Sequence, residues 1–270
     1  MCPLGSGALR GEISARNAAR CAQWPADVSW ASVPSIVYAE NDAGEHGNFL
    51  RSSYRRILQR PEWRARLAKV YTASRFLPRS SDRRRGELEC ANSSDALLMN
   101  IFCYPRVLTR KAVCSLLGIA AGQTAIFGFR TRIPFNNGRD DRSEMDLRLG
   151  NLFIEAKLTE NGFQSAPPAL VHRYRDLETV FDVSRLPMHR GKYRSYQLIR
   201  GALAIHAHGG NFAVFCDQRR PDLRDDCFAV MAAVASAELR CRMSVVTWQE
   251  LAVTMPLSVR GFLAEKYGVL

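Results

Sequence analysis

The segment RSEMDLRLGNLFIEAKLTE, residues 142–160, alternates charged and apolar side chains on both sides of Gly150 and Asn151. Glycine and asparagine tolerate a positive φ, so this dipeptide predicts a two-residue β-hairpin turn. A turn at these two residues places Asp146 directly opposite Glu155. The segment therefore predicts an antiparallel hairpin, with two carboxylates facing each other across its strands.

Successive side chains point to opposite faces of a strand, so the hairpin is expected to have one charged and one apolar face. The charged face is predicted to hold Glu144, Asp146, Arg148, Phe153, Glu155 and Lys157. The apolar face is predicted to hold Met145, Leu147, Leu149, Leu152, Ile154 and Ala156. The apolar face is typical of a core, and the charged face is predicted to be a functional site.

The alternative is a solvated face with ordinary cross-strand ion pairs. Against it, Asp146 opposite Glu155 is a like-charge pair, which destabilises a sheet unless a cation lies between the two carboxylates. Carboxylates together with a backbone carbonyl are ligands that suit a hard cation such as Mg²⁺. The pattern therefore favours a metal-binding site.

The composition favours a polyanionic partner. The chain has 270 residues, 47% of them hydrophobic, and its 38 lysines and arginines against 26 acids give a net charge of +12. Basic side chains neutralise phosphates and release their counterions. The eight cysteines occur singly, without a C-x-x-C pair, which predicts neither a zinc ribbon nor a thioredoxin-like site and fits a reducing cytoplasm. No stretch is long and apolar enough to span a bilayer, so no membrane partner is expected.

The predicted secondary structure changes near the middle of the chain, from helices to a mixture of strands and helices. Residues 1–118 carry helical spacing and are predicted to form an N-terminal helical region that packs on the core, although residues 1–35 show no sustained periodicity. Residues 119–270 read as β, β-hairpin, α, β, α, β, α, with the hairpin at 142–158. This order predicts an α/β core around one mixed sheet.

The hairpin motif resembles the active-site signature of the PD-(D/E)XK nuclease superfamily. Asp146, eight intervening residues and Glu155-Ala156-Lys157 match it, and the surrounding elements match the superfamily's α-β-β-β-α-β core. Over roughly residues 40–260 the chain is similar to bacterial restriction-endonuclease-like proteins of the PGN_0703-like type. The similarity is carried by three segments in the same order: SSDALLMNIF, DRSEMDLRL and IEAKLTE. Met145 stands where the superfamily has a proline or its equivalent.

The resemblance implies a nuclease that needs Mg²⁺, with Mn²⁺ as a substitute, and that hydrolyses DNA phosphodiester bonds in a restriction-type or repair-type reaction. Asp146, Glu155 and the Ala156 carbonyl would bind the metal ion. Lys157 would orient or deprotonate the attacking water and neutralise charge on the phosphate. The helix after the motif resembles a glutamine-containing helix of many members, which would place Gln197 in a structural role or beside the water.

Further candidates surround this set. The accessory acids are Glu144, Glu89 and Glu45; for Glu144 the alternative is a salt bridge to the opposed Lys157. Four arginines near the hairpin are predicted to hold phosphates, with a solvated loop as the alternative: Arg130, Arg132, Arg139 and Arg142.

Two other functions stay open. One is a catalytically idle nuclease-like module that binds nucleic acid or a protein partner; the other is a metal-independent enzyme acting on RNA. A homodimer is a further expectation.

Overall fold

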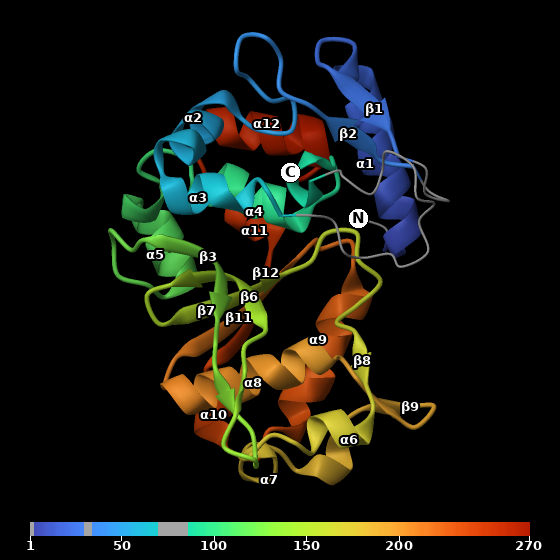
Figure 1. Ribbon diagram of the computed structural model, residues 1–270, viewed down its shortest axis with the longest axis vertical. Helices are drawn as coiled ribbons and strands as arrows, with labels where there is room; N and C mark the ends of the chain where they lie inside the picture. Colours follow the sequence, from blue (N-terminus) through green and yellow to red (C-terminus); the bar gives the residue numbers. More distant parts are fainter. Residues whose placement is uncertain (1–2, 30–33, 70–85) are drawn as a thin grey trace. The chain divides into compact units, whose positions relative to one another are not determined.

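The computed structural model describes residues 3–29, 34–69 and 86–270 (Figure 1). The contacts within the chain divide it into two compact units, which are described separately. The sheet unit consists mainly of residues 123–247, and the helical unit consists of residues 4–122 and 248–270.

The sheet unit contains a five-stranded mixed sheet with the strand order β12-β11-β7-β6-β3. Its strands are β3 (Ala125–Arg130), β6 (Glu144–Leu149), β7 (Leu152–Ala156), β11 (Asn211–Cys216) and β12 (Met243–Thr247). β3, β6 and β7 pair antiparallel, whereas β11 runs parallel to both β7 and β12. The predicted α/β class with one mixed sheet is confirmed.

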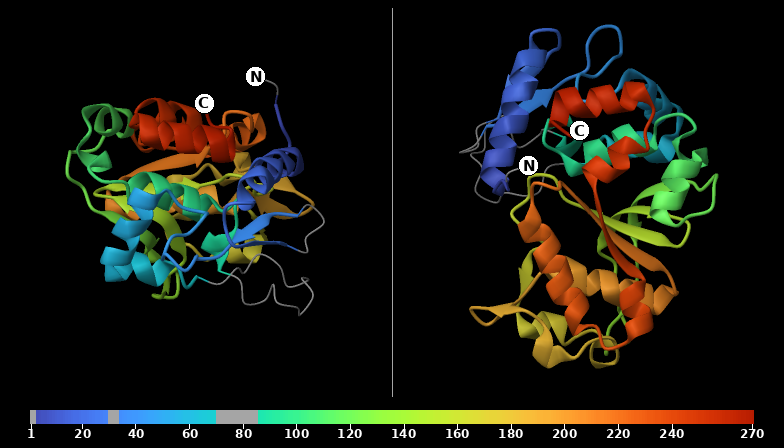
Figure 2. Two further views of the ribbon diagram at one scale, coloured as in Figure 1. Left: turned by 90° about the horizontal axis from the view of Figure 1, so that it is seen from above. Right: turned by 180° about the vertical axis from the view of Figure 1, so that it is seen from behind.

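Shorter strands and the remaining helices complete this unit. The strands are β4 (Ile133–Pro134), β5 (Asp140–Asp141), β8 (Ser165–Ala166), β9 (Met188–His189) and β10 (Lys192–Arg194). The helices are α6 (Pro168–Val171), α7 (Leu177–Val180), η4 (Val183–Arg185), α8 (Tyr196–His208), α9 (Pro221–Ala233) and α10 (Ala237–Cys241). Figure 2 shows α8 and α9 beside the sheet when the molecule is seen from behind.

The predicted hairpin is present in the predicted register. Leu147 pairs with Ile154 and Leu149 with Leu152, and the turn at Gly150 has a φ of 59°. The recorded β6–β7 pairs stop at Leu147, one step before Asp146 and Glu155 would meet. Local turn chemistry and alternation were therefore enough to fix the register of these strands.

One member of the expected apolar face packs differently. The β3–β6 ladder skips Gly128, whose φ of 64° is left-handed. Beyond this interruption Met145 is fully buried in the core cluster that also contains Phe153 and Tyr174. The strict alternation predicted for the hairpin therefore does not extend to Met145, because the neighbouring strand is distorted there.

Helix α8 packs closely on the sheet. Leu198, Ile199 and Ala202 belong to the same buried cluster as Phe153 and Phe212. Gly201 faces the ring of Phe212, and a Cβ at position 201 would lie 2.4 Å from the Cζ atom of Phe212. Only a residue without a side chain permits this approach.

The helical unit brings the two ends of the chain together. Its helices are α1 (Ser6–Cys21), α2 (Arg51–Gln59), α3 (Pro61–Arg66), η2 (Glu87–Glu89), α4 (Ser94–Phe102), η3 (Val107–Thr109), α5 (Lys111–Leu117), α11 (Trp248–Val253) and α12 (Leu257–Tyr267). Its strands β1 (Ala26–Val28) and β2 (Ile36–Tyr38) form an antiparallel pair.

Within residues 1–35, which lack sustained periodicity, α1 forms a helix that buries Leu9, Ile13 and Asn17. One feature of this unit differs from the expectation. Residues 248–270 were assigned to the core, whereas they group with the helical unit. Asn17 Nδ2 donates to the Lys266 carbonyl at 3.0 Å, so packing against α1, rather than chain order, determines where α12 lies.

Candidate functional site

The open end of the β6–β7 hairpin and the start of α8 bring four predicted residues together. Asp146 lies on β6, Glu155 on β7, Lys157 just after β7 and Gln197 in the first turn of α8. The part of the charged face that β7 contributes is covered, because Glu155 is 2% exposed and Lys157 is 6% exposed, whereas Asp146 on β6 is half-buried. The backbone N–H of Lys157 donates to the Phe215 carbonyl at 2.7 Å and keeps the chain aligned with β11.

Glu155 is the centre of this cluster. Its Oε1 accepts hydrogen bonds from Lys157 Nζ and from Gln197 Nε2, each at 2.5 Å. Among the described residues, no hydrogen bond reaches the second oxygen, Oε2. Asp146 Oδ2 accepts the backbone N–H of Ala156 at 2.7 Å, so this carboxylate holds the two strands together where their backbone ladder ends.

The charges of the cluster keep Lys157 protonated. Burial alone lowers the pKa of Lys157, but the carboxylates of Glu155, Asp146 and Glu160 outweigh burial and hold the pKa above its ordinary value. The cation that two facing carboxylates require is therefore supplied in part by the chain itself. A protonated Lys157 can neutralise or orient a negative group.

Two polar atoms beside the cluster lack partners. Gln197 Oε1 and Ser195 Oγ are both buried, and neither has a hydrogen bond to any residue that the structure describes. Both residues line a cavity of about 380 Å³, together with Lys157, Glu160 and Asp226. Asp146 and Glu155 are not among its lining residues. Buried polar groups are normally paired with protein or water, so these atoms mark a place for a bound polar species.

The donor set fits a magnesium ion better than a transition metal. No group of three or more histidine, cysteine or acidic side chains that could hold a metal occurs within residues 3–29, 34–69 and 86–270. Mg²⁺ keeps several waters and is commonly held by only one or two carboxylates together with substrate phosphates. Asp146, Glu155 and Gln197 carry oxygen atoms that could serve as ligands of this kind.

A second buried network adjoins the site and was not predicted from the sequence. Asp141 Oδ2 accepts the Tyr174 hydroxyl at 2.5 Å, and Tyr174 in turn contacts the Tyr196 hydroxyl at 2.7 Å. Arg200 Nε lies 3.3 Å from the same carboxylate oxygen, and Arg200 Nη2 donates to the Glu144 carbonyl. Although burial raises the pKa of Asp141, hydrogen bonds from Ser143 and Tyr174 and the charge of Arg200 lower it below its ordinary value.

Ser195 and this network could not be predicted, because they depend on contacts between distant segments and no motif surrounds them. Glu160 ends the hairpin segment but lies outside the Glu-x-Lys signature, and its Oε2 accepts the nearby backbone N–H of Leu158 at 2.6 Å. Ser195 has a left-handed φ of 55°, and the residues beside it in the sequence do not predict this conformation.

The accessory acids are divided between the two units. Glu144 is exposed on β6, and Lys157 forms its ion pair with Glu155 on its own side of the hairpin, at 2.5 Å. Glu45 and Glu89 belong to the helical unit. Glu45 pairs with Arg51, and Glu89 Oε2 accepts the backbone N–H of Gly86 at 2.8 Å. A part for any of these acids in the site stays a prediction.

Three of the four predicted phosphate-binding arginines lie together. Arg130, Arg132 and Arg142 line a cavity of about 410 Å³, which Arg139 does not line. All four are exposed, and within the described residues no side-chain hydrogen bond or ion pair occupies any of their guanidinium groups. An exposed arginine cluster without acidic partners is electrostatically suited to a polyanion.

The mixed sheet and its flanking helices define an α/β protein with a restriction-endonuclease-like fold. The chain belongs to the family described as Restriction Endonuclease associating with ARP, which matches residues 20–268. The match begins before the part of the chain, roughly residues 40–260, that the sequence resemblance covers. No curated protein and no solved structure matches the chain. No described helix is long and apolar enough to cross a membrane.

Proposed function

We propose that this protein is a Mg²⁺-dependent nuclease of the PD-(D/E)XK type that hydrolyses DNA phosphodiester bonds, in a restriction-type or repair-type reaction. One observation carries the proposal: Asp146, Glu155 and Lys157 cluster beside the orphaned oxygen of Gln197. The membership of a restriction endonuclease family supports the same substrate class.

Asp146 and Glu155 would hold the metal ion, with the Ala156 carbonyl as a further ligand. When bound, such an ion activates water and stabilises charge on a phosphate. Lys157 supplies a fixed positive charge that stabilises negative charge developing on the phosphate oxygens, since its pKa is held above its ordinary value. Gln197 fixes the orientation of the Glu155 carboxylate through its amide N–H, and its free oxygen can accept a hydrogen bond from a water molecule.

The arginine cluster would bind the nucleic-acid backbone. Arg130, Arg132 and Arg142 supply positive charge on the same unit as the carboxylates. Contacts with phosphates give affinity without sequence preference, and they weaken as salt rises. This division leaves phosphate binding to the arginines and bond cleavage to the carboxylate cluster.

A second candidate is a catalytically idle module that binds nucleic acid. It is favoured by one observation: Glu155 is almost fully buried, and Oε1 already accepts two hydrogen bonds. A closed ion pair of this kind is also compatible with a purely structural role.

A cleavage assay separates the two candidates. Supercoiled and linear duplex DNA, with single-stranded DNA and RNA as further substrates, should be incubated with the full chain in Mg²⁺ or in EDTA. Cleavage is expected only with metal, and Asp146→Asn, Glu155→Gln and Lys157→Ala should each reduce its rate by about 100-fold or more. Glu178→Gln, which changes an exposed acid on α7, is the matched control and should keep the wild-type rate.

DNA binding should survive in all of these variants. Binding without cleavage by the wild-type protein, under every metal condition, would instead support the idle module. Cleavage of RNA in the absence of metal would instead indicate a metal-independent enzyme that acts on RNA.

A further inference from the structure

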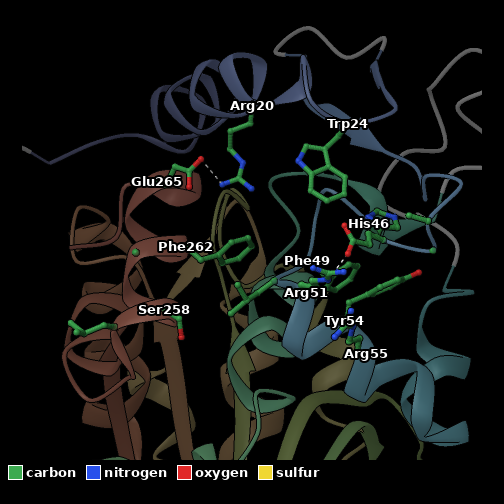
Figure 3. Close-up of a pocket in the computed structure, with 16 residues that line it drawn as sticks. Arg20, Trp24, His46, Phe49, Arg51, Tyr54, Arg55, Ser258, Phe262 and Glu265 are labelled. Carbon is green, nitrogen blue, oxygen red and sulfur yellow. Dashed lines mark ion pairs between the residues drawn. The ribbon is translucent and has the colours of Figure 1, made fainter.

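The helical unit contains a cavity of about 460 Å³ that the proposed nuclease site does not use. Its lining comes from the end of α1, the turn that follows α1, the loop before α2, α2 itself and α12. Figure 3 shows these side chains around the same space. A volume of this size is ordinary for a small-molecule site.

Aromatic rings form much of the wall. Phe49 and Tyr54 are stacked with a centroid distance of 5.3 Å, and the His46 ring meets the edge of Phe49 at 5.3 Å. Trp24 and Phe262 line the same cavity. Aromatic faces of this kind bind planar rings by stacking, largely without regard to the identity of the ring.

Trp24 is held in place by the backbone beneath it. A Cβ at position 47 would lie 2.8 Å from the Trp24 ring and 2.4 Å from the Tyr38 ring, so the glycine allows close packing on both sides. The indole is therefore a fixed wall of the pocket.

His46 lines the cavity and offers a hydrogen-bond donor. Its Nδ1 accepts the backbone N–H of Asn48 at 3.2 Å, and burial lowers the pKa of His46 to about 4, with the charge of Lys266 adding to the effect. The imidazole is therefore neutral at physiological pH and carries its proton on Nε2. Among the described residues, no hydrogen bond occupies Nε2, and the side chain lines the cavity.

The charge at the pocket selects against cations and for anions. The charged residues that line the pocket are two glutamates and three arginines, Arg20, Arg51 and Arg55. Glu45 pairs with Arg51, and Glu265 lies 2.9 Å from Arg20. Arg55 is exposed and has no hydrogen bond or ion pair within the described part of the chain. An aromatic cage for an ammonium ligand would need the opposite balance of charge.

We propose that this pocket binds a nucleotide, with the base against the aromatic wall, a ring acceptor atom at His46 Nε2 and the phosphate at Arg55. The ligand is either a free mononucleotide or an unstacked nucleotide of a nucleic-acid chain. The proposal does not depend on the carboxylate cluster of the sheet unit, and it gives the helical unit a binding function of its own.

Calorimetric titration of the full chain in EDTA tests the proposal. The probes are the four deoxynucleoside monophosphates, the matching nucleosides, inorganic phosphate and a short single-stranded oligonucleotide. At least one monophosphate or the oligonucleotide should bind, the corresponding nucleoside should bind more weakly, and phosphate alone should not bind. Trp24→Ala and Arg55→Ala should each weaken binding about tenfold or more, whereas Trp24→Phe should retain most of it.

Lys111→Ala is the matched control, since it removes one exposed positive charge of the helical unit outside the pocket. Glu155→Gln should bind like wild type, which separates failure of this proposal from failure of the nuclease proposal. Tighter binding of the oligonucleotide than of any monophosphate would identify a nucleic-acid chain as the source, and the reverse order a free nucleotide.

The proposal is overturned if no probe binds at millimolar concentration. It is also overturned if the folded Trp24→Ala and Arg55→Ala variants both bind like wild type. Arg55 is exposed on α2, so its variant is expected to fold even if Trp24→Ala does not.

Discussion

Gln197 Nε2 lies 2.5 Å from Glu155 Oε1, so a helix residue orients a strand carboxylate that precedes it by 42 positions. The same oxygen accepts Lys157 Nζ, which leaves the amide and the ammonium as joint donors to one atom. The orientation of Glu155 therefore depends on α8 as well as on its own strand.

Removing this amide tests how much the orientation matters. Gln197→Met keeps the side-chain volume but loses the hydrogen bond, and we expect cleavage to fall about 10- to 100-fold, as for other groups that orient metal ligands. The Mg²⁺ concentration that gives half-maximal activity should rise. Gln59→Met, at an exposed position of α2, is the control. An unchanged metal requirement in folded Gln197→Met would remove Gln197 from the site.

Replacing the buried Lys157 should lower the stability of the protein. Lys157→Met leaves the Glu155 carboxylate buried without its ion pair, which is expected to lower the free energy of unfolding by roughly 3–5 kcal/mol in EDTA. Urea titration measures this loss, and Mg²⁺ should stabilise the variant more than wild type, since a cation then replaces the ammonium.

A matched pair of variants completes this experiment. Arg194→Met breaks the more exposed ion pair with Asp226 and should lower the free energy of unfolding by at most about 1 kcal/mol. The double variant Glu155→Gln/Lys157→Met should recover much of the loss seen in Lys157→Met. Additive effects of the two single changes would contradict the coupling of these residues.

The arginine cluster predicts a measurable salt dependence. Replacing Arg130, Arg132 and Arg142 together by alanine should weaken DNA binding and flatten the plot of log affinity against log salt, by up to about 0.9 for each arginine that contacts a phosphate. Arg175→Ala is the control, because Asp176 occupies that guanidinium at 3.0 Å. Equal slopes for wild type and the triple variant would place the DNA elsewhere.

Asp141 predicts a pH-dependent contribution to stability. Its folded pKa is lowered, so its stabilisation is complete above the ordinary aspartate pKa of about 3.9 and is lost as the pH falls through the lowered value. Asp141→Asn should therefore cost about 1–3 kcal/mol at pH 7, and the difference from wild type should shrink in strong acid. Unfolding by urea at several pH values measures this trend. Asp225→Asn, at an exposed position of α9, is the control and should change the free energy of unfolding by at most about 0.5 kcal/mol at every pH.

Much of the hairpin could be predicted because its determinants are local. Gly150 adopts the left-handed conformation that the turn requires, and alternation along the strands determines which side chains share a face. The proximity of Gln197 to this face was expected only from a family resemblance. Its hydrogen bond to Glu155 depends on how α8 packs on the sheet, which no short segment encodes.

The partner of Lys157 shows where local reasoning ends. Extending the strand register predicted Glu144 as its opposite residue, but the recorded ladder stops at Leu147 and the ammonium pairs with Glu155 under the cover of α8. The placement of α12 depends likewise on contacts with α1, more than two hundred residues earlier. Such long-range contacts depend on the apolar surface that the whole unit buries, and no single segment of the sequence determines that surface.

The close approach at Gly201 means that the spacing between helix and sheet is set by a residue that takes no part in the proposed chemistry. Adding a single methyl group there would clash with the ring of Phe212, which is fully buried. The clash would lift α8 and lengthen the reach from Gln197 to Glu155, without altering any charge. A lineage could thus weaken or silence this centre while every acidic and basic side chain in it remained in place, so an intact motif alone is an incomplete guide to whether a related chain is active.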